Sequence, residues 1–186
     1  KRTEVSYKEV DPIKASVLRF YNKGFNNNLS QRYKAKLLMA TVDKIFFNEI
    51  REKNKLVYSI FMGEYFSQKL PIGLISIILG YDSDPKNVEV INKKIENILN
   101  GVKNKSFDKQ VFTNQKKALI NELKKEQNTN KYWIDSLIRA DKYKENFERY
   151  AYIEQIINQI SLNDISLLAK KYFDENYFNS IQLIKE

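Results

Sequence analysis

Arg51 and Tyr58 are the two side chains in this sequence whose types and spacing best suit the binding of a peptide. They lie seven residues apart in the segment IREKNKLVYSI, near the end of an expected helix and in the strand expected after it. A guanidinium offers a planar fork of donors and a tyrosine offers a hydroxyl, and both can hold a peptide carbonyl or a developing oxyanion. The residues alone leave a structural alternative open, in which Arg51 complements the negative end of the helix and Tyr58 is an ordinary strand aromatic.

The composition excludes several other kinds of site. The 186 residues include no His and no Cys. Zinc and copper sites use imidazole or thiolate in nearly all of their common forms, and a catalytic triad needs an imidazole base. We therefore expect this chain to bind no metal by itself, and thiol chemistry and disulfide bonds are excluded for the same reason.

Lysine carries most of the positive charge of the chain. The net charge is +9, from 32 basic and 23 acidic residues, and lysine pairs such as Lys93–Lys94 and Lys170–Lys171 are spread along polar helix faces. A nucleic-acid surface usually combines arginine and aromatic side chains on one face. We interpret the lysines as a solvated surface and expect no nucleic-acid partner. The least favoured function is a lysine-rich nucleic-acid binder, which would bind DNA with a steep salt dependence.

Other polar and aromatic side chains have simpler interpretations. Asp84 precedes Pro85 and fits a helix N-cap, and Asp82 and Asp84 bring too few oxygens together for a Ca²⁺ or Mg²⁺ site. We expect the paired aromatics to pack in the core rather than stack on bases, and the scattered glutamates to lie on helix surfaces rather than act as paired acids. These are Tyr132, Trp133, Tyr150 and Tyr152 among the aromatics, and Glu122, Glu126 and Glu145 among the acids.

The apolar pattern predicts the elements that position Arg51 and Tyr58. The spacing of Leu38, Val42, Ile45 and Ile50 predicts a long buried helix over residues 30–54. Runs rich in β-branched and aromatic residues predict strands, two of them joined by a hairpin across residues 67–71. The predicted strands cover residues 15–25, 56–65, 72–81 and 180–184, and the residues up to Asp11–Pro12 read as a polar lead-in.

Residues 84–173 are predicted to be helical. Asp84–Pro85 begins one helix, which Asn100–Gly101 is expected to end, and a second helix covers residues 108–127. Two or three shorter helices follow, and Ser161 and Asp164 form a capping-box-like start for the last one. Strands and helices in this order predict an α+β fold, a two-layer sandwich of a mostly antiparallel sheet with helices on one face.

We expect residues 1–186 to form a single domain. The sequence shows no linker and no internal repeat, and it begins at Lys1 rather than at Met, so we interpret it as a fragment of a longer multidomain chain. The longest apolar run, residues 72–79, is too short to cross a bilayer, and we expect no membrane span. The compartment stays open, with a soluble periplasmic or cytoplasmic location both possible.

The segment around Arg51 and Tyr58 resembles a junction of the pitrilysin/insulinase family of zinc metallopeptidases, the inverzincins. IREKNKLVYSI is similar to the LRE-x-x-x-L-x-Y-S pattern of that family, which follows a long helix and an opening strand. Three later segments fit in the same order: PIGLISIILGY, DPKNV and NSIQLIKE. The resemblance covers nearly the whole chain. It departs from the family at Leu56–Val57, because the family commonly has a Gly near this Tyr.

This resemblance implies an insulinase-like metallopeptidase domain with a particular role. Such proteins are built from two or four homologous α+β domains around a chamber, and the zinc motif HxxEH lies in another domain. The chain is similar to the His-free C-terminal domain of one half. The resemblance implies that Tyr58 hydrogen-bonds the scissile carbonyl and that Arg51 holds the neighbouring peptide backbone, while zinc in the partner domain activates water. The chain alone is not expected to be catalytic.

The implied partners are the zinc-binding N-terminal domain of the same parent protein, or a homologous subunit, and a peptide substrate. The implied function is a domain that closes the chamber of a zinc endopeptidase and binds an extended peptide, beside a strand edge in the manner of β-augmentation. A second function stays open, because relatives exist that keep the fold without the reaction. It is a noncatalytic structural or chaperone-like domain, such as the partner subunit of a processing peptidase. A parent chain with HxxEH upstream would separate the two.

Overall fold

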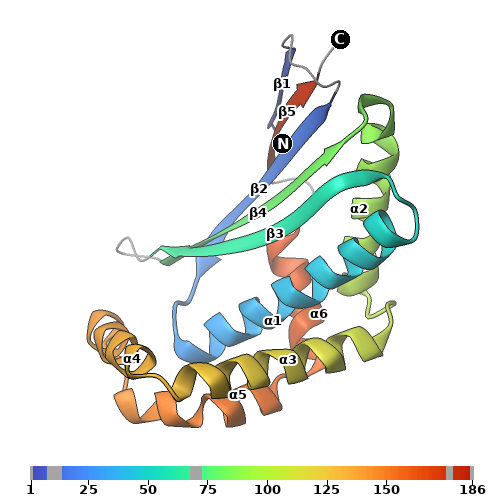
Figure 1. The fold of residues 1–186 in the computed structure, drawn as a ribbon. Helices are drawn as coiled ribbons and strands as arrows, with labels where there is room; N and C mark the ends of the chain where they lie inside the picture. The colour runs from blue at the N-terminus through green and yellow to red at the C-terminus, as the bar shows by residue number, and fades with distance from the viewer. Residues whose placement is uncertain (1, 8–13, 68–72, 175–177, 185–186) are drawn as a thin grey trace.

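The computed structural model of the chain describes residues 2–7, 14–67, 73–174 and 178–184. Its strands are β1 (Arg2–Tyr7), β2 (Ala15–Phe25), β3 (Val57–Ser67), β4 (Gly73–Ser83) and β5 (Phe178–Ile184). They form one sheet in the order β1-β5-β2-β4-β3, so β3 lies at an edge. Every neighbouring pair is antiparallel except β1 and β5, which run parallel. Helices cover one side of the sheet (Figure 1), and the predicted α+β sandwich is confirmed.

The helical layer begins with α1, the long helix that follows β2 (Figure 1). The helices are α1 (Leu29–Phe46), α2 (Val88–Lys103), α3 (Lys109–Gln127), α4 (Asn130–Tyr143), α5 (Ile153–Gln159) and α6 (Leu162–Tyr172). Three short helical turns complete it: η1 (Phe47–Glu52), which is π-helical, η2 (Pro85–Asn87) and η3 (Phe147–Tyr152), which are 3₁₀-helical.

Helix α1 is fixed against the sheet along its whole length. The side chain of Asn28 accepts a hydrogen bond from the Gln31 N–H at 3.0 Å and caps the first turn. Leu37, Leu38 and Val42 are fully buried at the predicted helical spacing. The helix contacts β3, α3 and α6. Because both ends of α1 are held, the residues that leave its C-terminal end enter β3 from a fixed position.

The two faces of the sheet differ in what covers them. Along β4, alternate residues such as Ile75, Ile77 and Leu79 are buried under the helices. The side chains between them face the other way and are half-buried or exposed, apart from the covered Gly80. We call this second surface the open face. It is formed by Ser16, Leu18 and Phe20 of β2, Ser59, Phe61 and Tyr65 of β3, Ile78, Gly80 and Asp82 of β4, and Ile181 and Leu183 of β5.

Two sequence expectations about the elements are wrong. The residues before Asp11 were expected to be a polar lead-in, but residues 2–7 form β1 by pairing with the distant β5, a tertiary pairing that no local pattern reveals. Gly101 was expected to end α2, but the helix continues to Lys103. A Cβ at Gly101 would lie 3.0 Å from the carbonyl oxygen of Ser106, so the glycine admits the following turn instead of ending the helix.

The other predicted elements agree within a few residues. The strand at residues 15–25 and the helix at 108–127, with Asp108 as its cap, are confirmed, and the Ser161–Asp164 capping box is present. Residues 8–13, 68–72 and 185–186 lie outside the described residues, including Asp11–Pro12 and most of the predicted hairpin connection. Within the described part, no helix is long and apolar enough to cross a membrane.

Candidate functional site

Arg51 lies in η1, the π-helical turn that ends the long helix. The turn is marked by the Lys53 N–H, which donates to the Asn48 carbonyl five residues back at 3.0 Å. Turns of this type are rare and are frequent at functional sites. Arg51 is exposed, its guanidinium carbon is 5.3 Å from the centre of the Phe47 ring, and it makes no ion pair with the described residues. Its fork of donors is therefore open to a ligand.

A tight turn joins this helix end to β3. Lys55 has a φ of 51°, the left-handed conformation that usually falls to glycine at a helix C-terminus. Its N–H donates to the Arg51 carbonyl at 3.0 Å, and the Leu56 N–H donates to the Ile50 carbonyl at 3.1 Å. The side chain of Asn87 donates to the Leu56 carbonyl at 3.4 Å. These bonds fix where β3 begins relative to Arg51.

Tyr58 occupies a β-bulge at the start of β3. Val57 is opposite Ser83 and Ser59 is opposite Asp82, so Tyr58 is the extra residue in the ladder. A bulge redirects a side chain and is found at sheet edges and beside active sites. Tyr58 is 61% exposed, and its hydroxyl makes no hydrogen bond within the described part of the chain. Its closest charged influence is Lys86, whose pKa is raised first by its bond to Asp84 and to a smaller extent by Tyr58.

Arg51 and Tyr58 thus lie on opposite sides of one turn, each on an irregular and exposed stretch of backbone. The sequence predicted that both side chains converge beside the sheet edge. No bond joins the two within the described residues, and their roles toward a peptide stay a prediction. Chemically, the arrangement offers six donor N–H and O–H groups that no other described side chain uses.

The edge of β3 is partly covered by an acid of α1. The Met62 N–H donates to a carboxylate oxygen of Asp43 at 2.9 Å. Burial raises the pKa of Asp43, and the bond from the Met62 N–H opposes that rise. A carboxylate on an edge N–H blocks the pairing of another strand at that point. The segment of β3 from Tyr58 to Phe61 lies on the Tyr58 side of this block.

Asp82 is a residue of this region that the sequence analysis considered only as a metal ligand. Its carboxylate accepts hydrogen bonds from Ser16 Oγ at 2.7 Å and Ser59 Oγ at 3.0 Å, and it pairs with Lys14 Nζ at 3.0 Å. Burial alone would raise the pKa of Asp82, but the three hydrogen bonds outweigh burial, and the pKa lies below its usual range. The signal that finds it is the register of β2, β4 and β3, which the sequence does not supply.

The remaining acidic candidates have structural roles. Asp84 caps η2 by accepting from the Lys86 N–H at 3.1 Å, as predicted. Glu122 and Glu126 are exposed on α3, as expected. The expectation for Glu145 is wrong, because it is buried and pairs with Arg32 of α1. Sequence spacing gave no hint of this pair, because the two residues are 113 apart.

The aromatic candidates mostly pack against one another. Trp133 makes edge-on contacts with the rings of Tyr132 and Phe147, and its indole N–H donates to the Gln127 carbonyl at 2.9 Å. Tyr150 is buried and stacks on Phe147. Tyr152 differs, since it is exposed. Packing therefore accounts for three of the four.

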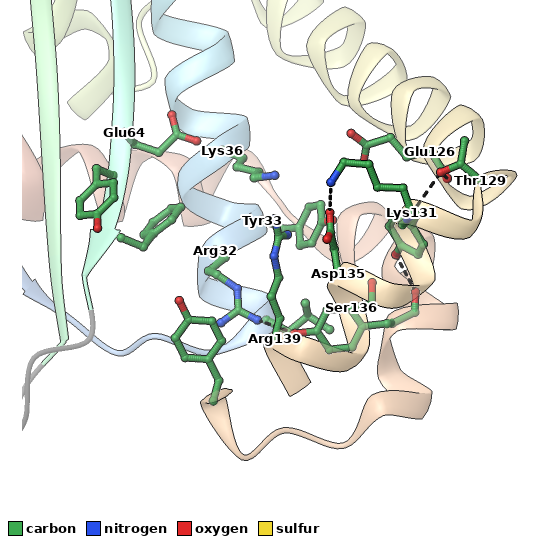
Figure 2. A pocket seen from close by; sticks show the side chains of 16 residues that line it. Arg32, Tyr33, Lys36, Glu64, Glu126, Thr129, Lys131, Asp135, Ser136 and Arg139 are labelled. Carbon is green, nitrogen blue, oxygen red and sulfur yellow. Dashed lines mark hydrogen bonds and ion pairs between the residues drawn. The ribbon is translucent and has the colours of Figure 1, made fainter. Parts of the chain in front are cut away.

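A cavity of about 390 Å³ lies at the opposite end of α1 from the candidate site, between β3, α3 and α4. Figure 2 shows Glu64 on its β3 side and the Lys131–Asp135 ion pair on its α4 side. The buried Arg32 of this cavity is neutralised by Glu145. Burial raises the pKa of Tyr33, which keeps its hydroxyl protonated. Arg51 and Tyr58 do not line this cavity.

The chain's own residues do not fit a zinc site. It has no His and no Cys, and the described residues contain no group of three acidic side chains that could hold a metal ion. Asp82 and Asp84 are each engaged by lysine and by hydrogen-bond donors instead. No chemistry of a metal is therefore assigned to this chain.

Comparisons with solved structures place this fold among proteases. The periplasmic protease PqqL from Escherichia coli matches with a TM-score of 0.78 and 15% identity, over 100% of this chain and 21% of its own. The ferredoxin protease FusC, in complex with Arabidopsis ferredoxin, matches with a TM-score of 0.81 and 15% identity, over 100% and 20%. A putative zinc protease from Bordetella pertussis Tohama I matches with a TM-score of 0.71 and 12% identity, over 96% and 97%. This chain spans about a fifth of the length of the first two.

Sequence comparison identifies the family. No curated protein matches the chain. The sequence model of the peptidase M16 inactive domain matches residues 2–119, more than half of the chain and all of the region from β1 through the candidate site to α2. The chain therefore belongs to the peptidase M16 family, the pitrilysin/insulinase metallopeptidases, and corresponds to the domain of that family described as inactive.

Proposed function

We propose that this chain is the non-zinc-binding domain of a zinc-dependent endopeptidase, in which it closes the proteolytic chamber and binds the peptide substrate through Arg51 and Tyr58. The observation that carries the proposal is the exposed, unpaired state of both side chains on two adjacent backbone irregularities. Its support is the family match and the short share of PqqL and FusC that the chain spans, which leaves room for a partner domain. Metal chemistry belongs to that partner.

The chemistry of the two side chains suits an extended peptide. The Tyr58 hydroxyl donates to the carbonyl of the bond that is cut, and this bond strengthens as the oxygen gains negative charge. The Arg51 fork donates to a neighbouring carbonyl and positions the backbone. Neither group has to leave another ion pair or hydrogen bond within the described chain before it binds.

The free edge of β3 gives the peptide a direction. An extended peptide adds to a sheet edge by main-chain hydrogen bonds. Asp43 already occupies the Met62 N–H, so strand addition is confined to the segment between Tyr58 and Phe61. That confinement would hold the peptide beside Tyr58 rather than along the whole strand.

The experiment is peptide cleavage by the full-length parent protein on a quenched fluorescent peptide library, with and without a chelator. We expect chelator-sensitive cleavage, and none by residues 1–186 alone. Tyr58→Phe should lower kcat/KM on the order of 10²-fold, the usual effect of removing one oxyanion donor. Arg51→Ala should also lower it, because the peptide loses its second contact.

Matched controls come from the same two elements. Tyr65→Phe removes a hydroxyl from a 66% exposed tyrosine at the far end of β3, and Lys53→Ala removes an exposed cation from the same helix end. Both should leave kcat/KM unchanged. Full activity of Tyr58→Phe and Arg51→Ala would refute the site. No cleavage by the parent under any condition would favour the noncatalytic structural function instead.

A further inference from the structure

A row of polar side chains crosses the open face beside Tyr58. Asp82 of β4 lies opposite Ser16 of β2 on one side and opposite Ser59 of β3 on the other. Each serine donates to a different oxygen of the carboxylate, at 2.7 Å and 3.0 Å. Ser59 directly follows the bulged Tyr58. The carboxylate is therefore held in a fixed orientation one residue away from the proposed peptide contact.

The carboxylate already receives an alkylammonium group. Lys14 Nζ lies 3.0 Å from Asp82 Oδ2, with side-chain exposures of 39% for Lys14 and 29% for Asp82. Lys14 precedes β2 and is not part of the sheet. An ammonium group on an aliphatic stem thus fits beside Asp82, and it reaches the carboxylate from the solvent side rather than through the core.

An apolar floor lies next to this polar row. Phe61, Gly80 and Leu18 are directly opposite one another on β3, β4 and β2. A Cβ at Gly80 would lie 2.5 Å from the Phe61 ring and 2.8 Å from Leu18, so these two side chains close over the glycine. Phe61 nevertheless stays 49% exposed. Carboxylate and floor together match a side chain with an apolar stem and a cationic tip.

We propose that Asp82 and the Phe61–Gly80–Leu18 floor form a subsite for one lysine or arginine side chain of a bound peptide, and that Lys14 fills this subsite when no peptide is bound. The inference rests on the proposed function in one respect: Arg51 and Tyr58 hold the peptide backbone next to the subsite. It adds the chemistry of the peptide residue that is recognised.

The exchange of Lys14 for a peptide side chain keeps the local charge balance. Asp82 pairs with Lys14, and the neighbouring Asp84 pairs with Lys86 at 2.9 Å. A basic peptide residue replaces one cation by another, and a half-exposed lysine loses little by returning to water. The chain carries +9 overall, so long-range attraction does not favour a basic peptide. Recognition is local and concerns one side chain.

The test uses the full-length parent protein and fluorescein-labelled octapeptides of Ala, Ser and Gly with one lysine at each position in turn. A matched set carries norleucine, which keeps the stem and removes the charge. Fluorescence anisotropy gives the ratio of the two affinities at each position. We expect lysine to be preferred at one position by about five-fold, as for a partly exposed ion pair, and Asp82→Asn to bring that ratio to about one.

A second variant separates recognition from a structural cross-strand clip. Lys14→Ala removes the internal competitor, so it should strengthen binding of the lysine peptide about two-fold while the norleucine peptide is unaffected. Asp135→Asn, which breaks the 2.7 Å surface pair with Lys131 on the remote α4, should change neither affinity. If Asp82 acts only as a clip, Lys14→Ala changes the thermal unfolding temperature and not the ratio, and that result overturns the inference.

Failure of this inference is distinguishable from failure of the proposed function. Cleavage that depends on Tyr58, together with equal affinity for lysine and norleucine peptides, overturns the subsite and keeps the function. A preference for lysine that depends on Asp82, in a parent without peptidase activity, supports the subsite and overturns the enzymatic function. Absence of any peptide binding by the parent overturns the subsite as well.

Discussion

The two ends of α1 each place an arginine beside a tyrosine, but in opposite physical states. Near the start, Arg32 is buried, and its guanidinium donates to Glu145, to the Tyr150 hydroxyl at 3.2 Å and to the Asn27 side chain at 2.9 Å. Near the end, Arg51 and Tyr58 are exposed, without an ion pair or side-chain hydrogen bond in the described chain. Burial and partners, rather than residue type, separate a structural pair from one that is free to bind.

The largest test of this contrast compares Arg32→Ala with Arg51→Ala. Arg32→Ala leaves the buried Glu145 carboxylate without its cation, and we expect the free energy of unfolding to fall by about 3–5 kcal/mol. Arg51→Ala should change it by less than about 0.5 kcal/mol, as for a surface side chain. Urea unfolding followed by the fluorescence of Trp133, the single tryptophan, measures both.

The double variant R32M/E145M is the control for that loss. Replacing both charges by apolar side chains of similar volume removes the uncompensated carboxylate, so most of the stability lost in Arg32→Ala should return. If Arg51→Ala proved as destabilising as Arg32→Ala, the two ends would not differ in the way described.

The next test removes one hydroxyl from each end. The Tyr150 hydroxyl accepts from Arg32 and donates to Glu145 at 2.8 Å, so Tyr150→Phe leaves buried polar groups short of a partner. We expect a loss of about 1–3 kcal/mol in the free energy of unfolding. Tyr58→Phe should leave the free energy of unfolding unchanged while it lowers cleavage by the parent. Equal losses of stability in the two variants would contradict the contrast.

The sequence predicted most of the fold because its strongest signals are local. The buried spacing along α1, the Asp108 and Asp84 caps and the Ser161 capping box act within a few residues, and each one is confirmed. What failed depends on distant residues. Strand β1 exists through its pairing with β5 at the other end of the chain, and the Arg32–Glu145 pair joins two segments 113 residues apart.

The site was predicted in its residues but not in its geometry. A spacing of seven between Arg51 and Tyr58 suits a helix that turns into a strand, and the structure has that turn. The π-helical turn and the β-bulge are irregularities of backbone, which residue types do not specify. Asp82 was missed as a binding residue because its partners come from three strands in one register. Its neighbour Lys14 is 68 residues away, so spacing alone could not pair them.

A smaller test asks whether backbone strain differs between the two ends. Lys55 after η1 and Lys144 before Glu145 both have a positive φ, 51° and 52°. Glycine adopts this conformation without the clash of a Cβ, so Lys55→Gly and Lys144→Gly should each raise the free energy of unfolding by about 0.5–1 kcal/mol. Equal gains would show that strain is local and unrelated to burial. A gain at Lys144 alone would indicate that the turn next to Arg51 needs its lysine.

The smallest expected effect concerns acid and the one paired charge at the exposed end. The folded-state pKa of Asp82 is depressed, so its contribution to stability is present above the unfolded value of about 3.9 and is lost as the pH falls through the folded-state pKa. Wild type should therefore exceed Asp82→Asn in free energy of unfolding by a few tenths of a kcal/mol at pH 6, as for a partly exposed pair. That difference should shrink steadily below about pH 4. Urea unfolding of both proteins from pH 6 to pH 2 measures it, and a difference that grew toward low pH would contradict an ionised Asp82 held by Ser16, Ser59 and Lys14.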